Sequence, residues 1–66
     1  MQPYQQRVVD EKTTLDEKIV NLNVFIKQSP IFISLPEDEK SRLIAQKAYM
    51  DGYSEILGER IAAFEK

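Results

Sequence analysis

Apolar residues in the second half of the chain recur every seven positions. This repeat consists of Leu43, Met50, Leu57 and Phe64. Since an α-helix has about 3.6 residues per turn, a seven-residue spacing returns to nearly the same face. The pattern predicts a helix over about residues 36–64, with one face packed against a neighbouring helix.

A second stripe of small and apolar residues is displaced by two positions, or about 200° around the same helix. It consists of Ala45, Tyr49, Gly52, Ile56 and Ala63. A helix with one neighbour needs only one apolar stripe, so the second stripe predicts a second packing partner. We expect that partner to be another copy of the chain, in a coiled-coil-like homo-oligomer with this stripe at its interface.

The dipeptide Asp51-Gly52 is the main signal against one long helix. Asp-Gly is typical of turns, and glycine costs about 1 kcal/mol in a helix relative to alanine. The seven-residue spacing nevertheless passes through Gly52 without a change of phase. We therefore expect a continuous helix in which Gly52 permits close approach of a second helix.

The first half of the chain carries a similar apolar stripe. Its members are Tyr4, Val8, Leu15, Ile19, Leu22 and Ile26. Pro3 precedes them, at a position where the first turn of a helix tolerates proline. The pattern predicts a helix over about residues 3–27. Gaps in the stripe fall at Glu11 and Lys12, and we expect either of these residues to reach the interior.

Residues 28–35 contain Pro30, with Pro36 directly after them, so a loop is expected there. Its apolar run, residues 31–33, either closes the end of the core or forms an exposed docking patch, and we favour closure. Ser34 and Glu37 have the spacing of a capping box. Acidic residues 37–39 suit the positive end of the helix dipole, which explains them better than a metal site does.

Two long helices joined by a short loop should lie antiparallel, giving an all-α hairpin with residues 1–66 as a single domain. We pair Ile26 with Leu43 at the ends nearest the loop. In this register, two residues lie side by side across the hairpin when their numbers sum to about 68 or 69. Tyr4 then meets Phe64 and Ile19 meets Met50. The same register brings the polar pair Glu11 and Arg60 within one helical turn, which predicts an ion pair across the hairpin.

Composition supports assembly of a small protein. The chain has 66 residues with no cysteine and no histidine, which excludes disulfides and the usual zinc sites as stabilising devices. A formal net charge of −2 gives no general attraction to nucleic acid or to an anionic membrane. No apolar run approaches the roughly 20 residues that span a bilayer. We expect a soluble intracellular protein.

One group of residues combines guanidinium and aromatic chemistry near the open end of the expected hairpin. It consists of Tyr4, Arg7, Glu11, Tyr53 and Arg60. Arginine binds phosphate or carboxylate in a bidentate manner, and tyrosine offers a ring for stacking. These residues either line a site for a small anionic ligand between subunits or serve as packing and register-setting groups. The second interpretation is the simpler one.

Enzymatic activity is not expected from this sequence. It has no histidine or cysteine to act as base or nucleophile, and its two glycines do not form a phosphate-binding loop. We expect no cofactor and no metal. A short basic strip of Lys40, Arg42 and Lys47 could contact DNA, but the acidic residues beside it make this the weakest candidate.

Three segments resemble a family of short helical proteins of tailed bacteriophages and prophages, related to a crAss-like phage protein. They are residues 4–12 (YQQRVVDEK), 15–19 (LDEKI) and 53–61 (YSEILGERI). The resemblance covers nearly the whole chain, with residues 28–36 as the variable part. The resemblance assigns no binding or catalytic role to any single residue, because the similar segments are patterns of helix surface and helix-packing positions.

The resemblance implies a phage accessory protein that acts in the cytoplasm of the infected bacterium. Small helical proteins of this kind oppose bacterial immunity in two ways. Some sequester nucleotide signalling molecules in pockets between subunits, which would place Tyr4, Arg7, Tyr53 and Arg60 around the ligand. Others inhibit a host defence protein directly, through a helix face or through residues 31–33. We expect the first activity and retain the second as the alternative.

Overall fold

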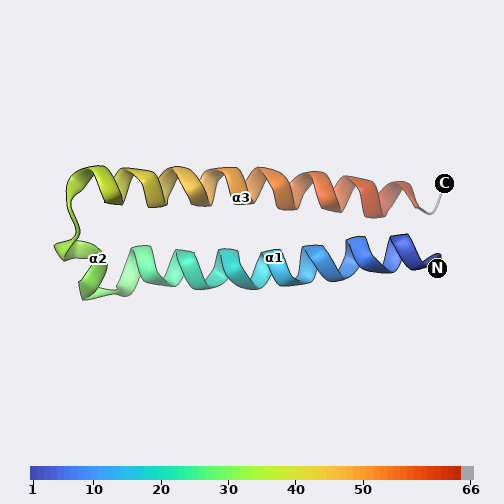
Figure 1. Ribbon diagram of the computed structural model, residues 1–66, viewed down its shortest axis with the longest axis horizontal. Coiled ribbons are helices and arrows are strands. Elements are labelled where there is room, and N and C mark those ends of the chain that lie inside the picture. Colours follow the sequence, from blue (N-terminus) through green and yellow to red (C-terminus); the bar gives the residue numbers. More distant parts are fainter. Residues whose placement is uncertain (65–66) are drawn as a thin grey trace.

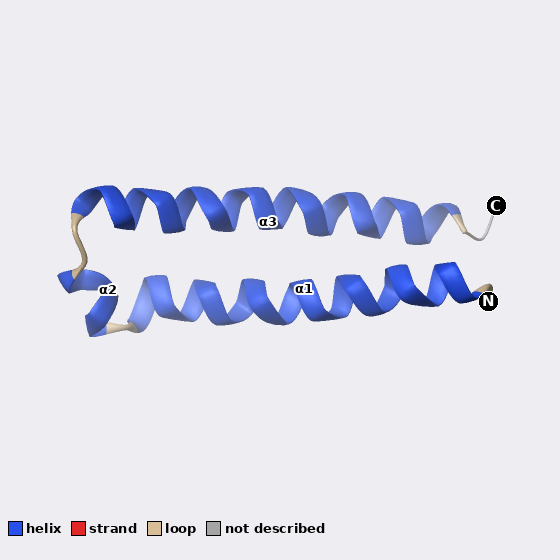
Figure 2. Ribbon diagram, viewed as in Figure 1, coloured by secondary structure: helices blue, strands red, loops and turns tan. Residues whose placement is uncertain are grey.

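Residues 1–64 are described by a computed structural model, and they form three helices (Figure 1). They are α1 (Pro3–Gln28), α2 (Pro30–Ser34) and α3 (Glu37–Ala63). The two long helices lie side by side and antiparallel, and α2 closes one end (Figure 2). The described residues contain no strand. The all-α class and the packing of two long helices are therefore confirmed.

Helix α1 begins and ends where local chemistry dictates. The backbone N–H of Gln2 donates to Gln5 Oε1 at 2.8 Å, and Pro3 occupies the first turn without losing a hydrogen bond. At the other end, Pro30 disfavours helical backbone at Ser29, which is extended (φ −82°, ψ 127°). The Ser29 N–H still donates to the Phe25 carbonyl at 3.2 Å.

The expected loop over residues 28–35 is partly wrong, because it contains α2. Ser29 begins this short helix: its Oγ accepts a hydrogen bond from the Ile31 N–H at 3.2 Å, and Pro30 supplies a favourable first-turn φ. Phe32 is buried and packs edge-on against Phe25, with ring centroids 5.9 Å apart. Phe32 alone closes the core here, since Ile31 and Ile33 are exposed.

The predicted capping box at Ser34 and Glu37 is also wrong. Ser34 Oγ instead donates to the Ile31 carbonyl at 2.8 Å, because Ser34 lies in the last turn of α2. Pro36 is the residue that precedes α3, and its carbonyl accepts from the Lys40 N–H at 3.0 Å. The acidic first turn of α3 is present as expected.

Helix α3 is continuous through Asp51 and Gly52, as the seven-residue spacing predicted. Gly52 has negative φ, so it does not need glycine's backbone freedom. A Cβ placed on Gly52 would meet nothing within 4 Å in the hairpin. The contacts within one chain therefore do not explain why glycine occupies this position.

The core is a narrow seam between α1 and α3. Leu57 lies at its centre with 1% of its surface exposed, and Val8 and Leu15 cover it from α1. Four partly buried residues pack around this cluster: Ile19, Met50, Ile61 and Phe64. At the open end, the Tyr4 and Phe64 rings meet edge-on at 5.9 Å, which confirms the predicted register.

A polar cluster of Lys12, Asp16 and Ser54 crosses the seam on one side. Lys12 Nζ donates to Asp16 Oδ2 at 2.8 Å and to Ser54 Oγ at 3.0 Å. Ser54 Oγ in turn donates to Asp16 Oδ1 at 2.5 Å. The three side chains form a closed ring of hydrogen bonds, and Ser54 is the buried member. The hydrogen bond from Lys12, followed by that from Ser54, lowers the pKa of Asp16 below 3.8.

This cluster replaces the predicted ion pair between Glu11 and Arg60. Both of those residues are exposed, and within residues 1–64 no ion pair joins them. Of the two gaps in the apolar stripe, Glu11 is exposed and Lys12 is partly buried. Lys12 is the one that turns inward, because Ser54 and Asp16 can satisfy its ammonium group there.

Replacement of Ser54 tests the contribution of the polar cluster. Ser54→Ala removes one acceptor for Lys12 and one donor to Asp16, so we expect a loss of about 1–2 kcal/mol in the free energy of unfolding. Urea denaturation at fixed protein concentration measures it. Ser41→Ala, an exposed Ser-to-Ala change in the same helix, controls for helix propensity. If Ser54→Ala and Ser41→Ala lowered the free energy of unfolding equally, the hydrogen bonds of Ser54 would not stabilise the fold.

The Asp16 carboxylate should make part of the stability depend on pH. Since its pKa is lower in the folded chain, its contribution is present above pH 3.8 and is lost as pH falls through the folded-state value. We expect Asp16→Asn to destabilise the protein between pH 5 and pH 7 and to cost progressively less below pH 3.8. Urea denaturation of both proteins across this range measures the difference. A difference independent of pH would argue against an ionised Asp16 in the cluster.

Candidate functional site

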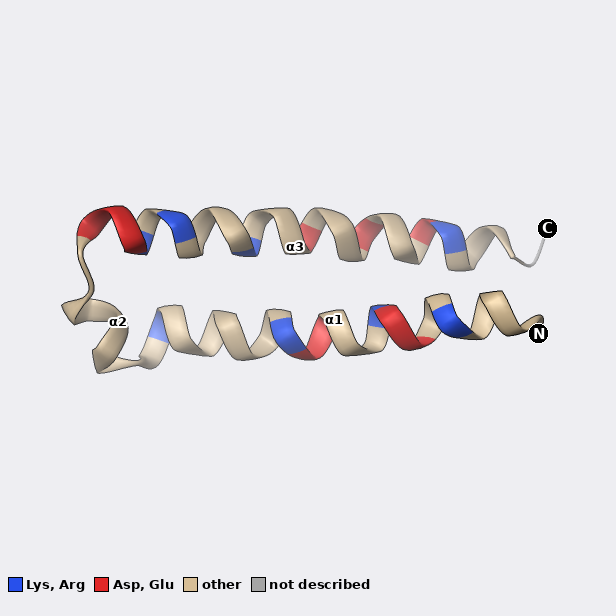
Figure 3. Ribbon diagram, in the orientation of Figure 1, with Lys and Arg blue, Asp and Glu red and all other residues tan. Residues whose placement is uncertain are grey.

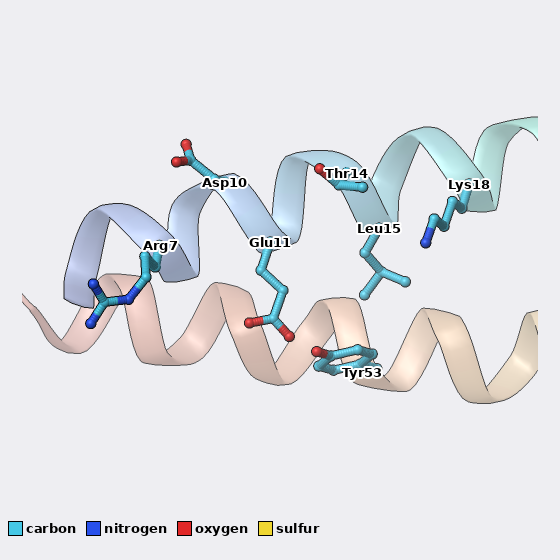
Figure 4. A pocket seen from close by; sticks show the side chains of 7 residues that line it. All are labelled: Arg7, Asp10, Glu11, Thr14, Leu15, Lys18 and Tyr53. Carbon is cyan, nitrogen blue, oxygen red and sulfur yellow. The ribbon is translucent and has the colours of Figure 1, made fainter. Parts of the chain in front are cut away.

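The opposite side of the seam holds a groove of about 490 Å³. Helix α1 supplies six of its residues and α3 supplies one. The lining consists of Arg7, Asp10, Glu11, Thr14, Leu15, Lys18 and Tyr53 (Figure 4). The register of the hairpin positions this group, because it holds Tyr53 of α3 opposite the middle of the α1 row.

The α1 residues follow helical spacing along one face. Arg7, Glu11 and Lys18 are separated by one and about two turns, and all three side chains extend toward α3 (Figure 4). At 1.5 Å per residue, the Cα atoms of Arg7 and Lys18 are about 16 Å apart along the helix. Tyr53 lies between these two cations, with 46% of its surface exposed. The groove therefore presents an aromatic ring with the Glu11 carboxylate beside it and a cation farther along α1 in each direction.

The two carboxylates of the groove differ in their surroundings. Asp10 points away from α3, and its Oδ1 accepts a hydrogen bond from Gln6 Nε2 at 2.9 Å. Glu11 points toward α3, with its carboxylate beside the hydroxyl end of Tyr53 (Figure 4). Within residues 1–64, no ion pair engages Arg7, Glu11 or Lys18. Their charges are thus available to a ligand.

The structure brings together three of the five residues predicted for a ligand site. Arg7, Glu11 and Tyr53 share the groove. Tyr4 lies at the open end, where its ring packs on Phe64, and Arg60 is exposed outside the groove lining. A role for these five residues in binding stays a prediction.

Four lining residues were not predicted for the site: Asp10, Thr14 and Lys18, and Leu15, which was expected only in the apolar stripe. Thr14 and Lys18 follow Arg7 at spacings of seven and eleven residues. Those spacings return to one helix face, so extending the row from Arg7 and Glu11 would have found both. Asp10 lies at its edge and carries no comparable signal.

The stripe predicted for self-assembly is uncovered in the single chain. Tyr49 and Ile56 are exposed, as are Ala45, Gly52 and Ala63. This surface is on α3, and none of its residues belongs to the core cluster or packs against it among residues 1–64. Its role as an interface stays a prediction.

The remaining charged candidates are occupied by local ion pairs. Lys40 contacts Glu37, Arg42 contacts Asp38 and Glu39, and Lys47 contacts Asp51. Figure 3 shows the acidic start of α3 followed directly by this basic strip. The described residues contain no group of acidic side chains arranged to hold a metal ion. Among them, no helix is both long and apolar enough to cross a membrane.

Comparison with known proteins identifies the family. The chain matches the family model described as Sequestin over residues 2–63, which covers all three helices. Neither the comparison with curated proteins nor that with solved structures gives a match. The family name is consistent with a protein that sequesters a molecule. The chain belongs to the Sequestin family.

Proposed function

We propose that this protein is a non-catalytic accessory protein that sequesters a nucleotide-type signalling molecule. On this proposal it acts in the cytoplasm of a phage-infected bacterium, where removal of the signal counters host immunity. The ligand lies at the interfaces of a homo-oligomer. The family name and the resemblance of residues 4–12, 15–19 and 53–61 to phage proteins both favour this role.

The groove is the observation that carries the proposal. A nucleotide combines an anionic phosphate with a flat base, and the groove contains two cations and an exposed aromatic ring, together with the carboxylates of Asp10 and Glu11. Arg7 and Lys18 flank Tyr53 without forming an ion pair within residues 1–64. Binding of an anion therefore does not require breaking an internal contact. The absence of histidine and cysteine fits capture better than conversion of the ligand.

The surface of the single chain supports assembly. It exposes 4976 Å², whereas a compact monomer of 7.7 kDa is expected to expose about 4,300 Å². The excess of roughly 650 Å² approaches the about 800 Å² that each partner buries in a standard interface. A second copy packed on the α3 stripe would bury surface of this order. An open groove on one hairpin would then gain a wall from its neighbour.

A protein-binding role is the alternative, and α2 is the feature that favours it. Ile31 and Ile33 are 62% and 72% exposed at the closed end of the hairpin. Exposed isoleucines on a short ordered helix suit contact with an apolar patch on a host defence protein. Loss of activity on replacing these two residues, with Arg7 and Tyr53 dispensable, would favour this alternative.

Substitutions in the groove test the nucleotide proposal. We expect Arg7→Ala and Tyr53→Ala each to weaken nucleotide binding at least tenfold, because each removes a charge-assisted or stacking contact. Isothermal titration calorimetry with cyclic dinucleotides measures the dissociation constants. The matched control is Arg42→Ala, which removes an exposed arginine distant in sequence from the groove. Equal binding by all variants would overturn the proposed site.

Gly52 provides a test of the assembly surface. In an isolated hairpin, Gly52→Ala should stabilise α3, because the new Cβ meets nothing within 4 Å and alanine is favoured by about 1 kcal/mol. If a second copy packs closely there, the same change should weaken association at least tenfold. Sedimentation velocity over a range of protein concentrations measures association and so distinguishes an isolated hairpin from one that packs against a second copy at Gly52.

Gly58→Ala is the matched control for this experiment. Its Cβ would lie 3.4 Å from Lys12 Cε, an ordinary contact within the hairpin, and Gly58 is not part of the stripe. We expect its association to match that of the unaltered protein. If Gly52→Ala stabilises the chain and leaves association unchanged, the stripe is not a close helix-packing interface.

A further inference from the structure

Two charged residues continue the spacing of the α3 stripe. Arg42 precedes Ala45 by three positions. Glu59 fills the gap between Ile56 and Ala63. With these two residues the stripe steps alternately by three and four over positions 42–63, which is the spacing of a helix-packing seam. All of these positions are exposed in the single chain, so a partner on this surface meets a positive charge near one end and a negative charge near the other.

These charges disfavour a parallel pair of α3 helices. In a parallel pair, each seam residue lies at the level of the same residue in the second copy. Arg42 would then face Arg42, and Glu59 would face Glu59, so like charges would repel at both ends. Gly52 would face Gly52 and leave a gap between them. A second copy that runs in the opposite direction avoids all three mismatches.

An antiparallel pair turns the same residues into complementary contacts. Two residues of different copies then lie at one level when their numbers have a constant sum, and a sum of 101 aligns the stripe from position 42 to position 59. Arg42 of one copy faces Glu59 of the other, and Tyr49 faces Gly52. Because a two-fold axis relates the copies, each contact occurs twice.

The next antiparallel register, with a sum of 108, lacks these contacts. It sets Tyr49 against Glu59, and it places Arg42 beyond Ala63, the last residue of α3. The two charges therefore select the register with the sum of 101.

The sizes of the facing side chains fit this register as well. Tyr49 is 81% exposed, which makes it the most exposed aromatic residue among residues 1–64. A Cβ placed on Gly52 would meet nothing within 4 Å in the hairpin. The ring of Tyr49 from a second copy would occupy that space, which explains a glycine that the contacts of one chain do not explain.

The local ion pairs of Arg42 leave room for this contact. Its guanidinium lies 2.8 Å from Glu39 and 3.5 Å from Asp38, and its side chain is still 65% exposed. A guanidinium has five N–H donors, so it can bind the Glu59 carboxylate of a second copy while it keeps its local partners.

We infer that two copies pack their α3 helices antiparallel, with Tyr49 of each on Gly52 of the other and Arg42 of each paired with Glu59 of the other. This inference rests on the self-assembly within the proposed function and specifies the direction and register of the partner. It does not depend on which ligand the assembly holds.

Reversal of the two charges tests the inference. Arg42→Glu sets carboxylates against each other and Glu59→Arg sets guanidinium groups against each other, so each should weaken self-association at least about tenfold. Combining both changes in one chain, or mixing the two single variants, restores opposite charges at every contact. We expect both to recover association to within about threefold of the unaltered protein. Sedimentation velocity over a range of protein concentrations measures the dissociation constants.

Glu55→Arg is the matched control for charge. It makes the same change at an exposed glutamate one turn from Glu59, outside the alternating spacing. We expect its association to match that of the unaltered protein. In a parallel pair, Glu55 would instead flank Arg60 of the second copy, and the reversal would weaken association.

The outcomes separate this inference from the function on which it rests. If the unaltered protein associates but neither the mixture nor the double variant recovers association, the antiparallel register is overturned while assembly stands. Association unchanged by either single reversal would have the same meaning. An unaltered protein that stays monomeric at every concentration would overturn both. Recovery of association in a protein that binds no nucleotide would support the inference and overturn sequestration. Circular dichroism of the single variants verifies that lost association does not come from unfolding.

Discussion

The narrow seam between α1 and α3 is the constraint on which the rest of this structure depends. Two helices share a single contact surface, and here its buried apolar part is centred on Leu57, with Val8 and Leu15 against it. Domains of this size are marginally stable, because they bury a small fraction of the surface that the unfolded chain exposes. Because the core of this hairpin is so small, any further apolar contact would add a large fraction of its total stability. The uncovered stripe on α3 is the surface that can provide one.

The two sides of the seam have different roles. On one side, Lys12, Asp16 and Ser54 close a ring of hydrogen bonds that fixes the register of the helices. On the other side, the same register sets Tyr53 opposite Arg7 and Glu11, where their polar groups have no such internal partners within residues 1–64. A hydrogen-bonded polar cluster on one side thus positions solvent-exposed polar groups on the other. A slip of one residue would rotate Tyr53 by about 100° and disperse the groove.

Much of this arrangement could be predicted from the sequence, because helical periodicity is a local signal. The apolar spacing indicated both long helices, the continuity through Gly52 and the level at which Tyr4 meets Phe64. The choice between Glu11 and Lys12 could not be made in this way, since both border the seam and the outcome depends on partners 42 residues away. Helix α2 was missed because two prolines were interpreted as breakers, although Ser29 and Pro30 also suit a helix start.

Native mass spectrometry of the protein purified from bacterial cells with an active nucleotide-based defence tests whether the hairpins assemble and retain a nucleotide. It determines the number of subunits and any retained small molecule in one measurement. We expect an oligomer that carries added mass equal to one or more nucleotides. A monomer without added mass, from cells in which the signal is being made, would contradict it.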